Sequence, residues 1–357
     1  MKVIISAGGT GGHIYPAISI INKIKEKDKK SEFLYIGTTD RMEKDIIPNL
    51  GIDYEGINIC GLSKNPVVLF KAIISTLKAI SKCKKIIKEF NPDIVIGVGG
   101  YVTFPVLYSA KKLGKKVLIH EQNSIPGKAN KVLSKYADTV CVSMKSSIKY
   151  FNHDNIVFTG NPRGEEILKG KKVNKSDLGF SDDKKLVLIT TGSLGAGSVN
   201  NLVIDLLPKF KKKDYEVLVV VGKKDYDKYR KIRTPKNVKI VDFIYNMNEV
   251  LKVVDVIVSR AGATTIAEIT SLGIPAILIP SPYVANNHQE INAIDMAEEG
   301  ACILVKEKDL TLEVLENNID MLFTDKKLYD NMKKTSKKIG VVDSSTRIYD
   351  EVLKLLK

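Results

Sequence analysis

Short apolar runs recur along the whole chain and alternate with longer amphipathic segments. Most of these runs are continuously apolar and rich in β-branched residues, which is typical of parallel strands covered on both faces. In the first half, the expected strands are Lys2–Ser6, Glu32–Ile36, Asp93–Val98, Lys116–His120, Thr139–Ser143 and Ile156–Thr159. In the second half, they are Leu186–Thr190, Glu216–Val221, Val238–Val241, Val256–Ser259, Ala276–Ile279 and Ile303–Val305.

The segments between these runs have helix length and a 3.6-residue apolar spacing, so the pattern predicts two consecutive α/β arrays, each a doubly wound parallel sheet. A chain of 357 residues also exceeds the usual size of a single core. The polar stretch Gly164–Lys185 separates the two arrays. The expected domains are therefore 1–163 and 164–357, and the last helix can pack back on the first domain. Functional loops are expected directly after strands, because open α/β sheets bind ligands beyond the carboxyl ends of their strands.

A glycine-rich loop, Gly8-Gly9-Thr10-Gly11-Gly12-His13, follows the first strand and leads into a helix. Its glycines let the backbone approach a ligand closely, with amides able to meet an anion at the helix start. A dinucleotide fingerprint does not fit, because Ile14 stands where the third glycine is required. His13 closes the loop, and a side chain that titrates near neutrality suits a general base. The alternative is a histidine that only packs or caps the turn.

Two loops of the second array have similar chemistry. Thr191–Ser198 follows a strand and offers backbone amides and hydroxyls suited to a diphosphate. Ser259–Thr265 follows another strand and starts a helix that carries Glu268, a carboxylate able to bind two ribose hydroxyls. An ordinary solvated helix acid is the alternative for Glu268. The amide-rich stretch Asn286–Asn292 suits the hydroxyls of a sugar, and it suits helix caps equally well.

The positive charge of the chain is uneven. Of the formal net charge of +15, most lies before residue 164, where 25 Lys and Arg stand against 13 Asp and Glu, compared with 31 against 28 afterwards. Such asymmetry suggests a polyanionic partner for the first half, either nucleic acid or an anionic membrane surface. The alternative is a lysine-rich chain that uses its charge for solubility.

The remaining composition points to a cytoplasmic protein. The apolar stretch at the start of the chain is too short for the core of a signal peptide. No apolar run in the sequence is long enough to cross a membrane. The cysteines have no metal-binding spacing and are expected to be small core residues in a reducing compartment; they are Cys60, Cys83, Cys141 and Cys302.

The loop motifs taken together resemble the MurG family of bacterial glycosyltransferases, which add N-acetylglucosamine to lipid I and so form lipid II for peptidoglycan. The matching motifs, in order, are GGTGGH (8–13), GVGGYVTFP (97–105), HEQN (120–123), GNPR (160–163), TGSLGA (191–196), DFI (242–244), SRAGATTIAEI (259–269) and NNHQEINA (286–293). The resemblance covers nearly the whole chain and implies a GT-B fold, in which two Rossmann-like domains face a central cleft.

The resemblance also implies the site residues. It assigns binding of UDP-N-acetylglucosamine to Thr10, Gly11, Gly12, Asn123, Arg163, Ser193, Ile244, Ala263, Thr264, Thr265, Ile266, Ala267, Glu268 and Gln289. Within that set, Glu268 is expected to hold the ribose, the Ile244 backbone the uracil, and Gln289 the sugar hydroxyls. His13 is the expected catalytic residue. The chain departs from many family members at Thr191 and Leu194, and Leu194 removes a polar side chain from the diphosphate loop.

The reaction implied is an inverting transfer to the muramyl 4-hydroxyl of lipid I, with no metal and no cofactor. The triplet Asp225-Tyr226-Asp227 matches the D-x-D pattern of metal-dependent glycosyltransferases, but it lies in a lysine-rich run where acids balance charge. A UDP-N-acetylglucosamine 2-epimerase or another UDP-sugar-dependent transferase is the alternative enzyme. A nucleic-acid partner is not expected, because no RNA- or DNA-binding motif is present.

The acceptor carries a polyprenyl tail, so the enzyme is expected to be peripheral on the cytoplasmic face of the cell membrane. The predicted helix 67–89 carries a stripe of lysines beside apolar residues; the lysines are Lys71, Lys78, Lys82 and Lys85, and the apolar residues are Phe70, Ile74 and Leu77. This face, with Leu62, is expected to rest on anionic lipid headgroups. An amphipathic helix packed on its sheet is the alternative.

Overall fold

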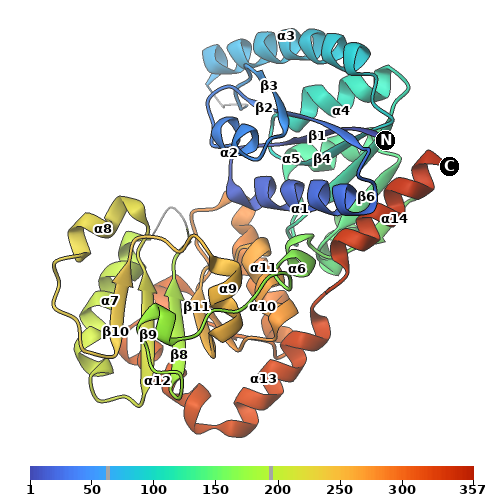
Figure 1. Ribbon diagram of the computed structural model, residues 1–357. Coiled ribbons are helices and arrows are strands. Elements are labelled where there is room, and N and C mark those ends of the chain that lie inside the picture. The colour runs from blue at the N-terminus through green and yellow to red at the C-terminus, as the bar shows by residue number, and fades with distance from the viewer. Residues whose placement is uncertain (62–64, 193–195) are drawn as a thin grey trace. The chain divides into compact units, whose positions relative to one another are not determined.

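The computed structural model describes residues 1–61, 65–192 and 196–357. These residues form two compact units (Figure 1). Unit 1 comprises Met1–Glu166 and the C-terminal segment Asp343–Lys357, and unit 2 comprises Ile167–Val342. Each unit contains a parallel β-sheet covered by helices, as the alternation of apolar runs and amphipathic segments predicts.

The described residues of unit 1 form a seven-stranded sheet in the order β3-β2-β1-β4-β5-β6-β7. Its strands are β1 (Lys2–Ala7), β2 (Glu32–Thr38), β3 (Asp53–Ile57), β4 (Ile94–Gly99), β5 (Lys116–Glu121), β6 (Thr139–Val142) and β7 (Ile156–Phe158). All the strands expected in this half are present. The edge strand β3 was not expected, because its acidic and half-exposed residues do not form an apolar run.

Helices cover both faces of this sheet. Side chains on alternate positions of a strand point to opposite faces, so Val3 and Ile5 of β1 pack with one group of helices and Ile4 packs with the other. The first group is α1 (Gly11–Lys27), α2 (Glu43–Asn49) and α14 (Ser344–Leu356). The second group is α3 (Pro66–Phe90), α4 (Thr103–Lys112) and α5 (Lys128–Leu133), and the unit also contains the short helix α6 (Arg163–Glu166) and 3-10 turns at Ser134–Tyr136 and Lys145–Tyr150.

The last helix, α14, returns to unit 1 through polar contacts at its start. The Ser344 hydroxyl donates to the Asn161 carbonyl at 2.6 Å, and the Ser345 hydroxyl donates to the Pro162 carbonyl at 3.1 Å. The Thr346 amide and hydroxyl both donate to the Glu165 carboxylate, at 2.8 and 3.0 Å. The start of α14 therefore holds the backbone directly before Arg163 and the Glu165 side chain after it.

The described residues of unit 2 form a six-stranded sheet in the order β10-β9-β8-β11-β12-β13. Its strands, all expected from the sequence, are β8 (Lys185–Thr190), β9 (Tyr215–Val220), β10 (Val238–Val241), β11 (Val256–Ser259), β12 (Ala276–Leu278) and β13 (Ile303–Leu304). Its helices are α7 (Gly197–Phe210), α8 (Lys223–Tyr229), α9 (Met247–Val250), α10 (Ala263–Leu272), α11 (His288–Glu298), α12 (Leu312–Thr324) and α13 (Lys326–Ile339), with 3-10 turns at Ser176–Leu178, Leu251–Val253, Ala285–Asn287 and Glu307–Asp309.

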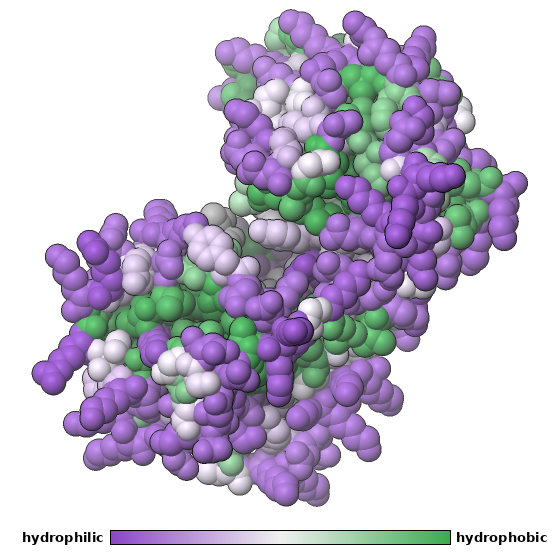
Figure 2. All heavy atoms as spheres, viewed as in Figure 1, coloured by the Kyte–Doolittle hydropathy of each residue, from purple (hydrophilic) through white to green (hydrophobic). Residues whose placement is uncertain are grey.

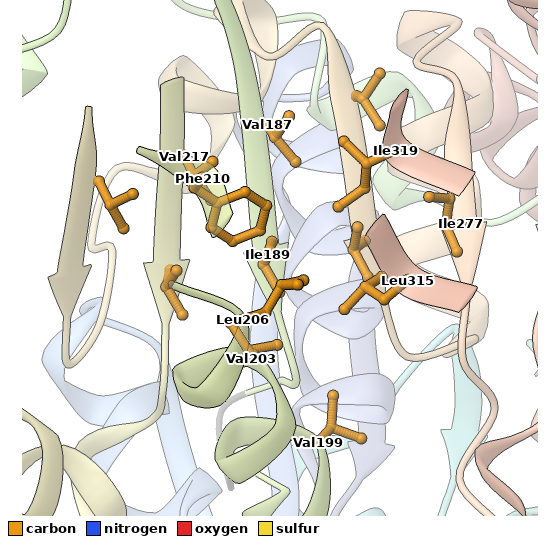
Figure 3. Close-up of a cluster of buried hydrophobic side chains, with 14 of the residues drawn as sticks. Val187, Ile189, Val199, Val203, Leu206, Phe210, Val217, Ile277, Leu315 and Ile319 are labelled. Carbon is orange, nitrogen blue, oxygen red and sulfur yellow. The ribbon is translucent and has the colours of Figure 1, made fainter. Parts of the chain in front are cut away.

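The core of unit 2 lies between one face of its sheet and the helices α7 and α12. Figure 3 shows strand residues such as Val187 and Ile189 directed toward Phe210 and Leu206 of α7 and Leu315 of α12. These side chains are almost fully buried. Burying an aliphatic or aromatic side chain of this size stabilises a protein by about 1.5 to 3 kcal/mol, so this cluster holds the sheet that positions the loops described below.

Hydrophilic side chains cover much of the surface of each unit in Figure 2, with apolar residues between them. Along the described stretches of chain, none of the helices combines the length and apolar character needed to cross a bilayer. Cys83, Cys141 and Cys302 are buried, as expected, but Cys60 is exposed, so for this residue the expectation of a core position was wrong.

Candidate functional site

Several helices that follow strands begin with neither a capping side chain nor an acidic first turn; α1, α7 and α10 are among them, and so are α4 and α5. By contrast, Asn65 caps α3, and Thr311 and Asp325 cap α12 and α13. The first amides of a helix have no partner within the helix and carry a partial positive charge. The starts of α1, α7 and α10, which also follow the glycine- and hydroxyl-rich loops, are therefore suited to an anionic ligand.

In unit 1, the glycine loop after β1 packs directly against the loop after β4. The Gly8 amide donates to the Gly99 carbonyl at 3.1 Å. A Cβ atom at Gly100 would lie 2.5 Å from the Gly8 carbonyl oxygen, and Gly100 has a φ of +92°. On the other side of the loop, the Gly9 amide donates to the buried carboxylate of Glu43 at 3.3 Å. These contacts fix the backbone that leads to Thr10, Gly11 and Gly12.

His13 lies in the first turn of α1 and is half-buried. Its imidazole ring rests against Gly99, where a Cβ atom would come within 2.7 Å of the ring nitrogen Nδ1 and 2.8 Å of Cε1. The same nitrogen lies 2.9 Å from the side-chain oxygen of Gln122, at the end of β5. The strands β1, β4 and β5 are neighbours in the sheet. The His13 ring, which follows β1, is thus held by residues at the ends of β4 and β5.

Behind His13 lies a second histidine, His120, which is fully buried. Its Nε2 lies 3.0 Å from the Gly160 carbonyl, and its Nδ1 lies 2.9 Å from the side-chain nitrogen of Gln122. Burial disfavours the charged imidazolium and lowers the pKa of His120 to about 4. His120 is therefore neutral at physiological pH.

Asn123 is held by the neighbouring carboxylate of Glu121, which is buried. Glu121 accepts hydrogen bonds from the Asn123 amide at 2.9 Å, from the Gly127 amide at 3.0 Å and from the Asn130 side chain at 2.9 Å. These bonds shape the turn after β5 and fix the direction in which the Asn123 backbone leaves the sheet.

Arg163 begins α6, where its amide donates to the Asn161 side chain at 3.1 Å. The centre of its guanidinium group lies 5.9 Å from the ring centroid of Tyr15, in the first turn of α1. The structure therefore brings all the unit 1 residues named from the sequence to the carboxyl edge of one sheet; they are Thr10, Gly11, Gly12, His13, Asn123 and Arg163.

In unit 2, the residues named from the sequence follow β10, β11 and β12. Ile244 comes after β10 and is 9% exposed. The run Ala263, Thr264, Thr265, Ile266, Ala267 and Glu268 forms the first turns of α10. Ser193 of the diphosphate loop and its neighbour Leu194 lie outside the described residues, as does Leu62 of unit 1.

Hydrogen bonds join these unit 2 loops. The Asn292 side chain of α11 donates to the Ala261 carbonyl at 3.1 Å, directly before α10. Gln289 lies three residues before Asn292, so it shares the same face of α11, and its side-chain oxygen accepts from the Ser281 amide at 2.9 Å. Arg260 donates to the Ile279 carbonyl at 3.1 Å and so ties the loop after β11 to the loop after β12.

In α10, the Glu268 side chain and the Thr264 hydroxyl are shielded from solvent. Glu268 is 9% exposed. The alternative, in which Glu268 is an ordinary solvated acid on a helix, is therefore wrong. The Thr264 hydroxyl is shielded from solvent and has no hydrogen-bond partner among the described residues. A buried hydroxyl without a partner costs free energy, so this group at an uncapped helix start is suited to a ligand that accepts a hydrogen bond.

Other polar residues of unit 2 are engaged within the protein. The Thr191 hydroxyl donates to Asn200 at 3.1 Å, and Asn200 in turn donates to Asp225 at 3.2 Å. Asp227 pairs with Arg230 at 2.8 Å. The D-x-D triplet thus has protein partners, and within the residues that the structure describes, no group of three His, Cys, Asp or Glu side chains is arranged to hold a metal ion.

The sequence analysis named no role for Gln122, His120 or Gly99. Their signal was present, because HEQN and GVGGYVTFP each span the carboxyl end of a strand. Neither spacing nor residue type, however, indicates that a buried glutamine contacts a histidine 109 residues earlier in the chain.

Comparisons with known proteins agree over the whole chain. The N-terminal domain of glycosyltransferase family 28 matches residues 3–142, and the C-terminal domain of that family matches residues 186–348. The chain is 46% identical to the UDP-N-acetylglucosamine–N-acetylmuramyl-(pentapeptide) pyrophosphoryl-undecaprenol N-acetylglucosamine transferase 1 of Bacillus cereus, with 100% of both chains covered.

Two solved structures extend the comparison. MurG of Acinetobacter baumannii is similar with a TM-score of 0.79 and 27% identity, over 99% of each chain. The UDP-GlcNAc 2-epimerase of Neisseria meningitidis bound to UDP-GlcNAc is similar with a TM-score of 0.68 and 18% identity, over 99% of this chain and 100% of the epimerase chain. The likeness to the epimerase shows the fold alone.

The contact between Gly99 and His13 predicts a specific stability effect. Gly99 and Gly9 both have a positive φ, but a Cβ atom at Gly9 would meet nothing within 4 Å. Alanine at either position costs about 1 to 3 kcal/mol of backbone strain. Gly99→Ala also drives a methyl group into the His13 ring, which costs about 1 to 3 kcal/mol more. Urea unfolding of both variants measures the difference.

The matched test is the Gly99→Ala substitution in a His13→Ala background, where the ring that the methyl group meets is absent. We expect this background to remove the extra cost of Gly99→Ala while leaving the cost of Gly9→Ala unchanged. An equal cost of Gly99→Ala with and without the His13 ring would contradict the described contact.

Proposed function

We infer, from the membership of this chain in the MurG family of glycosyltransferase family 28, that it transfers N-acetylglucosamine from UDP-N-acetylglucosamine to lipid I and so forms lipid II. The observation that carries this inference is the full-length match at 46% identity to a transferase named for that reaction. Both family domains and the GT-B fold agree with it. The chain is thus a hexosyltransferase of peptidoglycan synthesis.

Unit 2 carries most of the proposed contacts with the nucleotide sugar. The Ile244 backbone meets the uracil, Glu268 accepts hydrogen bonds from the ribose hydroxyls, and Gln289 meets the hydroxyls of the sugar. The burial of Glu268 supports its role, because a shielded carboxylate binds a hydroxyl pair more strongly than a solvated one. The bond between Gln289 and the Ser281 amide supports a fixed orientation of the Gln289 side chain.

The diphosphate is proposed to bind at uncapped helix starts. Within the proposed run Ala263 to Ala267, the amides of Ala263, Thr264 and Thr265 precede the first intrahelical bond, which the Ile266 amide donates to the Gly262 carbonyl, and Thr264 adds a hydroxyl without a partner among the described residues. Ser193 belongs to the same proposal through the resemblance. From unit 1, the amides of Thr10 to Gly12, the Asn123 turn and the Arg163 guanidinium complete the proposed donor contacts. Such donors stabilise the negative charge that develops as UDP departs.

His13 is proposed to take the proton in this reaction. The acceptor 4-hydroxyl oxygen forms a bond to the anomeric carbon of the donor, and the bond from that carbon to the phosphate oxygen breaks. UDP leaves with the electron pair, the configuration inverts, and the hydroxyl proton passes to His13. The ring nitrogen that does not contact Gln122, Nε2, is the one available to accept it.

Product analysis tests the transferase function. Incubation with UDP-N-acetylglucosamine and a short-chain lipid I analogue is expected to give equal amounts of UDP and of analogue enlarged by one N-acetylhexosamine, joined β-1,4. Without the analogue, no UDP and no epimerised donor should appear. Mass spectrometry of both products measures the outcome, and epimerised donor formed without an acceptor would point to the epimerase instead.

His13→Asn tests the proposed base in the same assay. Loss of a general base lowers kcat about 100-fold or more, because asparagine can hydrogen-bond but cannot take the proton. His153→Asn is a matched control, since His153 is a half-buried residue of unit 1 outside the loop motifs, and its ring contacts the Asn155 and Ala137 carbonyls, both at 3.1 Å. Native turnover by His13→Asn would overturn the role proposed for His13.

We also propose that the first turns of α3 meet the cytoplasmic face of the cell membrane, where the lipid acceptor lies. Large apolar side chains are exposed there; they are Val67, Val68, Leu69, Phe70, Ile73, Ile74 and Leu77. Lys71 and Lys78 lie among them and are exposed. Lys82 and Lys85, further along the helix, pair with Glu55 and Glu89. The opposite stripe of α3, including Ala79, Cys83 and Ile87, packs on the sheet. This arrangement supports a peripheral surface that combines burial of apolar groups with attraction to anionic lipids.

Neutralising two lysines tests the membrane surface. Each lysine near an anionic bilayer contributes about 1 kcal/mol, so the double variant Lys71→Gln, Lys78→Gln should bind anionic liposomes about 25-fold more weakly. The matched control is Lys334→Gln, Lys338→Gln, which removes the same charge from exposed positions of α13 in unit 2. Liposome sedimentation measures both, and UDP-N-acetylglucosamine affinity should not change. Equal loss in the two double variants would show that net charge, rather than the α3 surface, drives binding.

A further inference from the structure

We propose that Gln122 is a positioning residue that holds the neutral His13 ring in the tautomer with its proton on Nδ1, which leaves the Nε2 lone pair ready to take a proton. This inference rests on the proposed role of His13 as the base. It concerns how the chain selects one of two forms of that base, and it follows from hydrogen-bond partners within unit 1.

The orientation of the Gln122 amide is fixed by groups that can only accept hydrogen bonds. Gln122 is 1% exposed, and its side-chain nitrogen lies 2.7 Å from the Val98 carbonyl and 3.0 Å from the His120 carbonyl. A carbonyl oxygen has no proton to give, so the NH₂ group of the amide must face these two atoms. The amide oxygen of Gln122 therefore faces His13.

This orientation decides the tautomer of His13. The Gln122 oxygen lies 2.9 Å from His13 Nδ1, and it also can only accept. If Nδ1 carried its lone pair, two acceptors would oppose each other at hydrogen-bond distance in a partly buried position, which is unfavourable. The proton of the neutral ring therefore lies on Nδ1, and the lone pair lies on Nε2.

His120 stabilises the same orientation of the Gln122 amide. Its Nε2 faces the Gly160 carbonyl at 3.0 Å and must therefore carry the proton, so its Nδ1 has the lone pair. That lone pair lies 2.9 Å from the Gln122 nitrogen and shares one of the two NH₂ protons with the His120 carbonyl. An imidazolium at this position would direct a second N–H at the NH₂ group, and burial already keeps His120 neutral. Reversing the Gln122 amide would disrupt its contacts with Val98 and with both groups of His120.

The choice of tautomer matters for the chemistry. A free histidine side chain in water prefers its proton on Nε2, and in that form the exposed nitrogen would donate to the acceptor hydroxyl and could not take its proton. Gln122 thus selects the form that acts as a base. After proton transfer, the Nδ1 proton still donates to the Gln122 oxygen, and a hydrogen bond from a charged donor is stronger than one from a neutral donor.

The first test is nuclear magnetic resonance of the native chain labelled with ¹⁵N-histidine. The chain has four histidines, so single substitutions assign every signal. At alkaline pH, where imidazoles are neutral, we expect His13 to show a protonated Nδ1 and an unprotonated Nε2, and His120 to show the reverse. A protonated Nε2 on His13 in the native chain would overturn the inference without any variant.

The second test is Gln122→Met, which keeps the length of the side chain and removes its oxygen and NH₂ group. We expect the His13 signals to move toward the Nε2–H form while those of His153 and His288 stay in place. We expect kcat with the lipid I analogue to fall about 10- to 100-fold, with the KM for UDP-N-acetylglucosamine unchanged within about twofold. Unfolding or general loosening would instead move all four histidines. Native kcat in this variant would contradict the proposal.

These results separate the inference from the proposed function. If His13→Asn keeps native turnover, His13 is not the base, whichever tautomer it adopts. If His13→Asn is inactive but the native His13 ring is protonated on Nε2, the base is correct and the role of Gln122 is wrong.

Discussion

The close approach of two glycine loops is the constraint on which the rest of unit 1 depends. The loops after β1 and β4 touch backbone to backbone, and a side chain at Gly100 would collide with the Gly8 carbonyl. Because the backbones meet so closely, the His13 ring lies directly on Gly99, within reach of the Gln122 amide from β5. Motifs that are far apart in the sequence, at 8–13, 97–105, 120–123 and 160–163, thereby become one hydrogen-bonded arrangement around a single imidazole.

The uncapped N-termini of helices after strands are a second feature that fits the proposed binding role. α1, α7 and α10 follow strands and have neither capping side chains nor acidic first turns, a feature they share with α4 and α5, whereas α3, α12 and α13 are capped. A missing cap costs about 1 kcal/mol of stability. The cores of the two units offset that cost, and the free amides that result are the groups that the proposed function assigns to the phosphates of the donor. Local instability at these positions is therefore consistent with a binding role.

Much of the fold could be predicted from the sequence, because continuous apolar runs are typical of buried parallel strands. The prediction failed at β3, an edge strand whose acidic residues leave half its surface exposed. The loop motifs alone left turn, cap and packing alternatives open, so the site residues were named through the resemblance to the MurG family, and their roles in binding and catalysis stay predictions. The partners of those residues could not be named. Their contacts with Glu121, Gln122 and Glu43 depend on the order of the strands in the sheet. That order could not be derived from the sequence.

We propose a division of roles in which His13 takes a proton and Glu268 holds the nucleotide. The most direct measurement is the Kd of UDP-N-acetylglucosamine, by titration calorimetry, for the native chain, His13→Asn and Glu268→Gln. The account predicts that His13→Asn keeps the native Kd within about twofold. Glu268→Gln should weaken binding about tenfold or more, because it removes a charged hydrogen-bond acceptor. A large loss of affinity in His13→Asn, with native affinity in Glu268→Gln, would contradict the account.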